Sequence, residues 1–198
     1  MSLAKTYQKK TDREHILDAP DTYIGSVEQD TIKDWIIRDS ETLSTSSNSV
    51  VDKRKAFKME HKEFIWIPGL YKCFDEGIVN ARDHQIRMQQ KIAQGEDVKP
   101  VSYIHIDVDH ETGIISMTND GNGIDVEKHP DHNIWIPEMI FGHLRTSTNY
   151  DKTQKKIVGG KNGFGFKLVL IYSKWGYVET IDHTRGLKYK QEFKDNLT

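Results

Sequence analysis

The chain has 198 residues, 36% apolar and 29% charged, so it is long enough to bury a core and has the composition of an ordinary soluble domain. Its 28 basic and 30 acidic residues give a formal charge of −2, which argues against a surface built mainly to grip nucleic acid. The single cysteine excludes an internal disulfide, and no apolar run approaches the length of a membrane span. We therefore expect a globular domain without a membrane partner.

A short helix is predicted near the N-terminus, from Asp12 to about Ala19. Thr11 and Glu14 have the spacing of a capping box at its start, and Pro20 ends it. Two later stretches lack periodicity and are expected to be insertions. The first is flexible, rich in Ser and Thr and then basic, and covers about residues 40–60; the second covers residues 89–100.

The strongest helical periodicity runs from Leu70 to about Ile92. One apolar stripe predicts a core-facing side, formed by Leu70, Phe74, Ile78 and Ala81. Off this stripe, Glu76 and Asn80 are four residues apart and share a face. A carboxylate and an amide oxygen so placed can hold a water and a hard cation beside a phosphate, although an ordinary solvated helix face has the same pattern.

Two β-hairpins are predicted after this helix. The strands of the first cover residues 101–108 and 114–118, and those of the second cover 175–181 and 186–193. Helices on one face of a mostly antiparallel mixed sheet give an α+β fold, a two-layer sandwich.

The first hairpin ends in Asn119-Asp120-Gly121-Asn122-Gly123. These are turn-forming residues, so a tight loop is the simple interpretation. A carboxylate held between such residues at the mouth of a sheet can also accept a hydrogen bond from an exocyclic amine such as that of adenine. Asp120 is suited to this second role.

Four glycines fall within residues 159–165, and Lys167 follows. Backbone amides reach an oxyanion most closely where no Cβ intervenes, so the segment predicts a polyphosphate-binding loop, with an ordinary surface loop as the alternative. Its order is neither that of a Walker A motif nor GxGxxG. Residues 167–172 are apolar and predict a helix start or a buried strand.

These three motifs, in this order and spacing, resemble the signature of the GHKL family of ATPases. Flanking segments resemble more narrowly the N-terminal ATPase region of eukaryotic-type DNA topoisomerase II. They are YQKKT from Tyr7, PDTYIGS from Pro20, PGLYK from Pro68, IPEMIFGHL from Ile136 and STNY from Ser147. The resemblance covers most of the chain outside the two insertions.

The resemblance implies that the chain binds and hydrolyses ATP with Mg²⁺. Glu76 would be the general base, Asn80 the Mg²⁺ ligand and Asp120 the acceptor for the adenine amine. Further nucleotide contacts are implied for Ser147, Thr148, Asn149, Gly160, Lys161, Asn162, Gly163, Phe164, Gly165, Phe166 and Lys167. Tyr7 would lie on an N-terminal arm that exchanges between subunits when ATP binds.

The resemblance also implies one GHKL domain over residues 1–198, with an arm of about residues 1–12 and with the transducer and DNA-cleavage domains outside this chain. The implied partners are ATP, a second copy in a nucleotide-bound homodimer, and DNA, which this chain alone would hold weakly if at all. The implied location is inside the cell, most often the nucleus, although organellar and virus-encoded versions fit. From this chain alone we expect nucleotide binding, slow hydrolysis at most and no DNA cutting.

Several positions depart from the family pattern and leave affinity and rate open. Arginine is usual at Lys161, a small residue at Phe166, and asparagine at both His84 and Leu170. Gly77 follows the implied base; glycine within a helix costs about 1 kcal/mol relative to alanine and predicts local flexibility.

Two alternatives stay open. A MutL-type or Hsp90-type protein would share the nucleotide chemistry, against which the PDTYIGS and IPEMIFGHL segments argue. A catalytically silent binding or dimerisation module would keep the fold, against which the intact Glu76, Asn80 and glycine loop argue.

Overall fold

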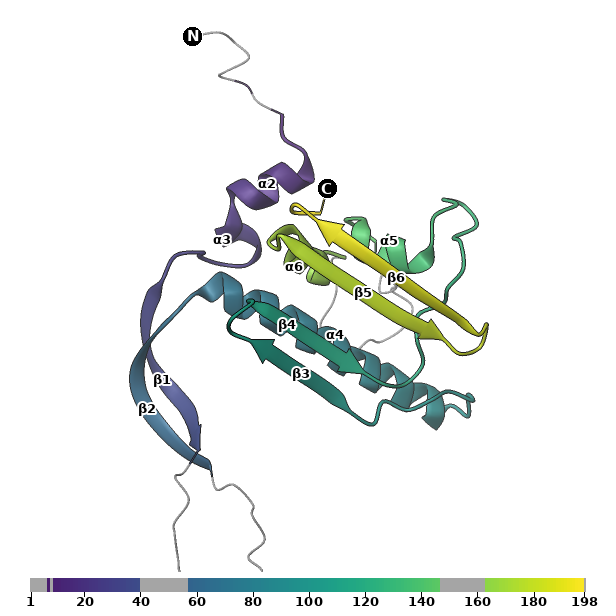
Figure 1. Ribbon diagram of the computed structural model, residues 1–198, viewed down its shortest axis with the longest axis horizontal. Coiled ribbons are helices and arrows are strands. Elements are labelled where there is room, and N and C mark those ends of the chain that lie inside the picture. The colour runs from purple at the N-terminus through teal and green to yellow at the C-terminus, as the bar shows by residue number, and fades with distance from the viewer. Residues whose placement is uncertain (1–6, 8, 40–56, 147–162, 198) are drawn as a thin grey trace, which may run out of the picture.

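A computed structural model describes residues 7, 9–39, 57–146 and 163–197 of the chain. Within these ranges the fold combines helices with three antiparallel hairpins, which confirms the α+β class (Figure 1). The hairpins pair β1 (Asp30–Asp39) with β2 (Phe57–Trp66), β3 (Ile104–Asp109) with β4 (Ile114–Asn119), and β5 (Trp175–Asp182) with β6 (Leu187–Lys194). Over the described residues these are three separate two-stranded sheets, with no ladder joining them into the single mixed sheet that was expected.

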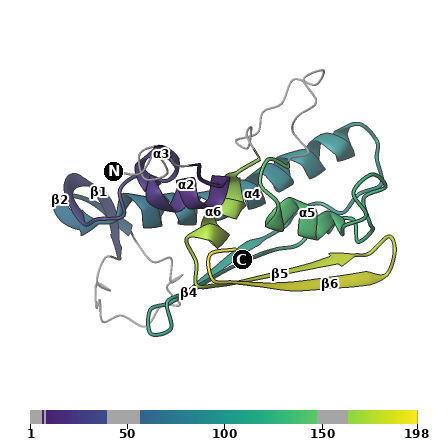
Figure 2. The ribbon, with the colours of Figure 1, turned by 90° about the horizontal axis from the view of Figure 1, so that it is seen from above.

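The helices gather on one side of the strands. Figure 2 shows α4 (Pro68–Ala93), α5 (Ile136–Gly142) and α6 (Gly165–Ile171) above β4, β5 and β6. Among the described helices none is both long and apolar enough to cross a membrane.

The N-terminal helix α2 (Asp12–Asp18) begins with the predicted capping box. Thr11 accepts from the backbone N–H of Glu14 through its hydroxyl, and the Glu14 carboxylate accepts from the Thr11 backbone at 2.7 Å. The helix ends before Pro20, and this proline starts a second single turn, α3 (Pro20–Tyr23). One fully buried residue of α2, Ile16, packs with Ile24 and two residues of α6, so the N-terminal segment is part of the core.

Helix α4 confirms the predicted periodicity but is longer than expected. It continues to Ala93, so residues 89–93 belong to the helix and not to an insertion. Gly77 is buried, and a methyl group there would lie 2.5 Å from the sulfur of Met117 on β4. The glycine therefore allows helix and strand to approach closely. Close packing is the physical role that the structure gives to this glycine, and the predicted local flexibility stays a prediction.

The β1–β2 hairpin was not predicted. It pairs Asp30 with Trp66 at its base and Asp39 with Phe57 at its far end, and it extends away from the other elements (Figure 1). Residues 57–60 thus start a strand rather than ending the predicted flexible insertion. The remainder of that insertion, 40–56, lies outside the described residues.

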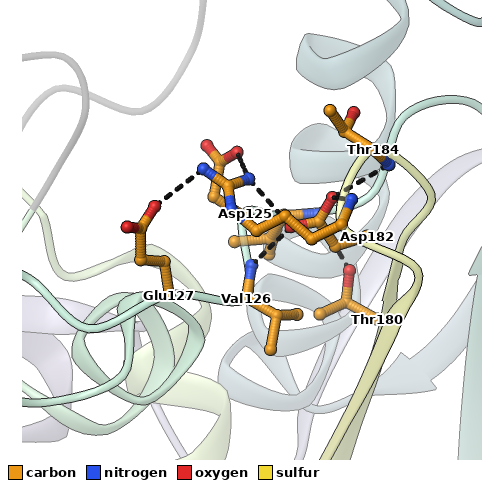
Figure 3. A network of polar contacts seen from close by, with 8 residues as sticks. Asp125, Val126, Glu127, Thr180, Asp182 and Thr184 are labelled. Atoms are coloured by element: carbon orange, nitrogen blue, oxygen red, sulfur yellow. Dashed lines mark hydrogen bonds and ion pairs between the residues drawn. The ribbon is translucent and has the colours of Figure 1, made fainter.

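The predicted hairpins β3–β4 and β5–β6 are both present, and a polar network joins the segment after β4 to the tip of β5–β6 (Figure 3). Asp182, which is 3% exposed, accepts from the backbone N–H of Val126 at 2.9 Å. Arg185 binds Asp125, Glu127 and Asp182 through its guanidinium at 2.7 to 2.9 Å. The network therefore attaches residues 125–127 to β5.

Residues 165–171 form a helix, which settles the alternative left open by the sequence. Two family departures are accommodated in the core beside it. Leu170 is 3% exposed and packs with Val178 and Phe193, while Phe166 meets Phe141 edge-on with ring centroids 5.6 Å apart. Both aromatic and aliphatic side chains thus contribute to packing between α6, α5 and the last hairpin.

Candidate nucleotide site

Helix α4 presents Glu76 and Asn80 one turn apart. The side-chain amide of Asn80 donates to the carbonyl oxygen of Glu76 at 2.8 Å. The Oδ1 of Asn80 is therefore the atom that remains to accept a hydrogen bond or to coordinate a cation. Within the described residues this oxygen accepts no hydrogen bond. The Glu76 carboxylate is 18% exposed and forms an ion pair with Lys72, one turn earlier, at 2.8 Å. The ion pair was missed by the sequence reasoning, although the i,i+4 spacing of Lys72 and Glu76 signals it.

The start of α6 lies against these two side chains. A methyl group added at Gly165 would lie 3.2 Å from Oε2 of Glu76 and 3.9 Å from Nδ2 of Asn80. The last glycine of the predicted phosphate-binding loop therefore meets the carboxylate and the amide of the predicted catalytic helix. Two of the three sequence motifs come together here.

Lys167 is placed differently from the expectation of an added point charge on the triphosphate. It is 4% exposed, and its ammonium donates to the carbonyl oxygens of Thr146 and Gly163 at 2.6 and 2.7 Å. These two residues border the undescribed segment 147–162. Burial lowers the pKa of Lys167 to about 8. In this structure the ammonium joins two stretches of main chain.

The carboxylate of Asp120 is held by the segment that leads into β3. Its Oδ1 accepts from the backbone N–H groups of Ser102 and Tyr103 at 2.7 and 3.1 Å, and its Oδ2 accepts from the Ser102 hydroxyl. These hydrogen bonds, with the Ser102 hydroxyl first, lower the pKa of Asp120. The group is therefore ionised and fixed in direction, and Oδ2 keeps a second lone pair for another donor.

The loop that carries Asp120 is fixed between the segment that precedes β3 and strand β5. On one side the backbone N–H of Lys99 donates to Oδ1 of Asn122 at 2.7 Å. On the other, Gly123 lies so close to β5 that an added methyl group would be 1.9 Å from the Ile181 carbonyl oxygen.

Phe164 and Phe166 point into the core rather than toward Glu76. Phe164 packs against the cluster of α2, α3 and α6 residues, with its ring 6.1 Å from that of Tyr23. Tyr7 is 77% exposed. The other predicted nucleotide contacts lie outside the described residues: Ser147, Thr148, Asn149, Gly160, Lys161 and Asn162.

Within the described ranges, no group of three or more His, Cys, Asp or Glu side chains is arranged so that it could hold a metal ion. A divalent cation beside Asn80 would therefore take most of its ligands from phosphate oxygens and water. Such a ligand set suits Mg²⁺, which keeps several waters and needs only one or two protein oxygens. The Oδ1 of Asn80 fits this requirement.

Comparison with known proteins agrees with this geometry. Residues 67–194 match the family described as histidine kinase-, DNA gyrase B-, and HSP90-like ATPase. The chain is 47% identical to the DNA topoisomerase 2 of Acanthamoeba polyphaga mimivirus over 99% of its length, and 44% identical to that of Candida albicans over 98%. It spans only 14% and 12% of those relatives.

Solved structures give the same relationship. The ATPase and transducer domains of DNA topoisomerase II from Balamuthia mandrillaris superpose with a TM-score of 0.83 at 39% identity, over 100% of this chain and 44% of that one. For the ATPase region of Saccharomyces cerevisiae topoisomerase II the TM-score is 0.80 at 40% identity, over 98% of this chain and 45% of that one. The chain therefore belongs to the histidine kinase-, DNA gyrase B- and HSP90-like ATPase family, and almost all of it is similar to the ATPase region of DNA topoisomerase II.

Proposed function

We propose that this chain is the ATP-binding and hydrolysing part of a type II DNA topoisomerase. The observation that carries the proposal is that a Cβ added at Gly165 would lie 3.2 Å from Oε2 of Glu76 and 3.9 Å from Nδ2 of Asn80, so the glycine lies against both side chains. It brings a loop suited to phosphate oxygens against a carboxylate suited to proton abstraction. Neither motif alone has that specificity.

In the proposed reaction Glu76 accepts a proton from a water whose oxygen attacks the γ-phosphorus of ATP. A bond forms between that oxygen and phosphorus, and the bond from phosphorus to the bridging oxygen breaks. The electron pair stays on the leaving ADP, and the proton goes to the carboxylate. Oε2, the oxygen that faces Gly165, is the atom placed for this transfer.

Asn80 would hold Mg²⁺ through Oδ1, while its Nδ2 stays on the carbonyl oxygen of Glu76. The ion would offset the charge that develops on the phosphates during transfer. The hydrogen bond fixes the orientation of the Asn80 amide, so the side chain already has the rotamer that would coordinate the ion.

Asp120 would accept the adenine amine on the free lone pair of Oδ2. The hydrogen bonds from Ser102 and Tyr103 support this role because they hold the carboxylate ionised and oriented. The remaining contacts to sugar and phosphates are assigned on family resemblance alone. They are Ser147, Thr148, Asn149, Gly160, Lys161, Asn162 and Gly163, with Tyr7 reaching the nucleotide of a second subunit. Phe164, Gly165, Phe166 and Lys167 would contribute through their backbone amides, because the two phenylalanine side chains pack in the core and the Lys167 ammonium donates to main-chain carbonyls.

The fold is proposed to be a two-layer sandwich in which the hairpins β3–β4 and β5–β6 contribute to one sheet under the helices. The arrangement of helices over these strands in Figure 2 supports this assignment. The whole chain would form a single domain, with its N-terminal arm near residues 1–12.

In the full-length protein, Mg-ATP binding is proposed to drive dimerisation of two such domains and to close a gate around a DNA segment. The similarity to DNA topoisomerase 2 from eukaryotes and a virus supports this role and an intracellular, most often nuclear, location. The formal charge of −2 favours DNA contacts made elsewhere in that protein. A MutL-like or Hsp90-like role and a silent module are less favoured, because the relatives described above are named DNA topoisomerase 2.

Thermal unfolding with a nonhydrolysable ATP analogue, with and without Mg²⁺, tests the binding step. A ligand at 100 times its dissociation constant stabilises the folded state by about 2.7 kcal/mol, so the melting temperature should rise, and more so with Mg²⁺. An unchanged melting temperature at millimolar analogue would refute the nucleotide site.

The catalytic step is tested by Glu76→Gln in the full-length protein. Turnover should fall by at least a hundredfold while analogue binding stays within a few-fold of wild type, because the amide keeps the shape but cannot accept the proton. Undiminished turnover would remove Glu76 from the mechanism.

A further inference from the structure

Lys72 contacts the proposed base more closely than any other charged group that the structure describes around it. Its ammonium lies 2.8 Å from Oε1 of Glu76 and 3.0 Å from Oδ2 of Asp75. The ammonium is thus anchored at two adjacent carboxylates rather than at one. A two-point anchor restricts its position on the helix surface far more than a single pair would.

The two oxygens of Glu76 have different surroundings. Oε1 faces Lys72, whereas Oε2 faces Gly165 at the start of α6. Of the three charged groups in this cluster Glu76 is the least exposed, at 18% against 40% for Lys72 and 38% for Asp75. Its carboxylate therefore lies between the Lys72 ammonium on one side and Gly165 on the other.

We propose that Lys72 is a positioning residue for hydrolysis, whose ammonium holds Oε1 of Glu76 so that Oε2 stays directed at the water beside the glycine loop. The inference rests on the proposed function of Glu76 as the base. Lys72 takes no part in the proton transfer: its hydrogen bond to Glu76 raises the pKa of the ammonium, so it stays protonated near neutral pH.

The alternative is an ordinary ion pair of a helix surface. Such pairs contribute little to folding stability, so an effect of Lys72 confined to stability would be small. A positioning role acts on the rate instead, because a misdirected base loses the near-attack geometry even though substrate still binds. Turnover and binding therefore separate the two explanations.

The experiment compares Lys72→Met with Lys72→Arg in the full-length protein, with ATP turnover and binding of a nonhydrolysable analogue as readouts. Lys72→Met should lower kcat tenfold or more and leave analogue affinity and KM within threefold. Lys72→Arg, which retains a cation that can reach the carboxylate, should recover most of the rate. The matched control is Lys91→Met: on the same helix, Lys91 pairs with Glu96 at 2.8 Å, away from the site, and its loss should leave turnover unchanged.

Three results would overturn the inference: kcat of Lys72→Met within twofold of wild type, loss of binding and folding together with turnover, or no recovery in Lys72→Arg.

A Glu76→Gln background separates the inference from the proposed function. If Lys72 acts through the base, adding Lys72→Met to Glu76→Gln should lower turnover no further, and an additive loss refutes it. Full activity of Glu76→Gln alone would instead refute the proposed base.

Discussion

Replacement of Gly123 by alanine should destabilise the protein and detach the adenine-side loop from β5. The added methyl group would lie 1.9 Å from the Ile181 carbonyl oxygen, and backbone atoms cannot rotate away as a side chain can. Reaching even 3.0 Å requires a shift of 3.0 − 1.9 = 1.1 Å between loop and strand. Such a shift would break the 2.9 Å hydrogen bonds from the backbone N–H of Ile124 to Thr180 and of Val126 to Asp182.

The expected loss follows from these two bonds. The bond to the Thr180 hydroxyl contributes about 1 kcal/mol and the bond to the Asp182 carboxylate about 2 kcal/mol, together about 3 kcal/mol. For a domain of this size the melting temperature should fall by roughly 6 to 12 °C. Affinity for an adenine nucleotide should fall as well, because Asp120 lies three residues earlier in the same loop.

Thermal unfolding and analogue titration measure both effects. Gly142→Ala is the matched control, since its methyl group would lie 3.3 Å from a side chain, the Phe193 ring, rather than 1.9 Å from a backbone atom, so a shift of only a few tenths of an ångström is needed. A Gly123→Ala protein that melts within 2 °C of wild type would show that the loop does not depend on this close approach.

Two further predictions concern Lys167 and Thr11. Burial lowers the pKa of Lys167 to about 8 from an ordinary 10.5, so the contribution of this residue to stability is greatest above pH 10.5 and is lost as the pH falls through 8. In urea unfolding, the free energy of unfolding of the wild type relative to Lys167→Met should therefore rise by up to about 3 kcal/mol between pH 7.5 and 10. A difference between the two proteins that does not change with pH would contradict this. Thr11→Ala removes the hydroxyl that caps α2 and should cost about 1 kcal/mol, whereas Thr11→Ser should be nearly neutral; equal melting temperatures for the alanine variant and the wild type would refute the cap.

Elements with local signals were predictable from the sequence. Helix α4 has an apolar stripe, α2 a capping box, and the two later hairpins have turn residues between apolar runs. The shared face of Glu76 and Asn80 follows from their spacing alone, because a helix brings residues four apart together. Their meeting with Gly165 was expected only from family resemblance, since it joins segments almost ninety residues apart.

Features that depend on tertiary contact were not predictable. Strand β1 places Ile32, Trp35, Ile36 and Ile37 on both of its faces, so it lacks the alternation that indicates a half-buried strand. Gly77 predicts local flexibility from its helix propensity, whereas its close packing depends on Met117, on a strand about forty residues later, and has no local signal in the sequence. The partners of Lys167 are main-chain carbonyls, which every residue has and which therefore leave no mark in a sequence.

The β1–β2 hairpin extends away from the other elements (Figure 1) and should unfold locally more readily than they do. Its strands contact chiefly each other, and one of its faces exposes Trp35, Ile37, Met59 and Ile65. Among the described residues these two strands pair with no other strand, and a two-stranded ribbon by itself is marginally stable in water. Its amide protons should therefore exchange with solvent through local opening, while those of α4 and α6 exchange only on cooperative unfolding. The β1–β2 hairpin should thus have a lower local stability than α4 and α6.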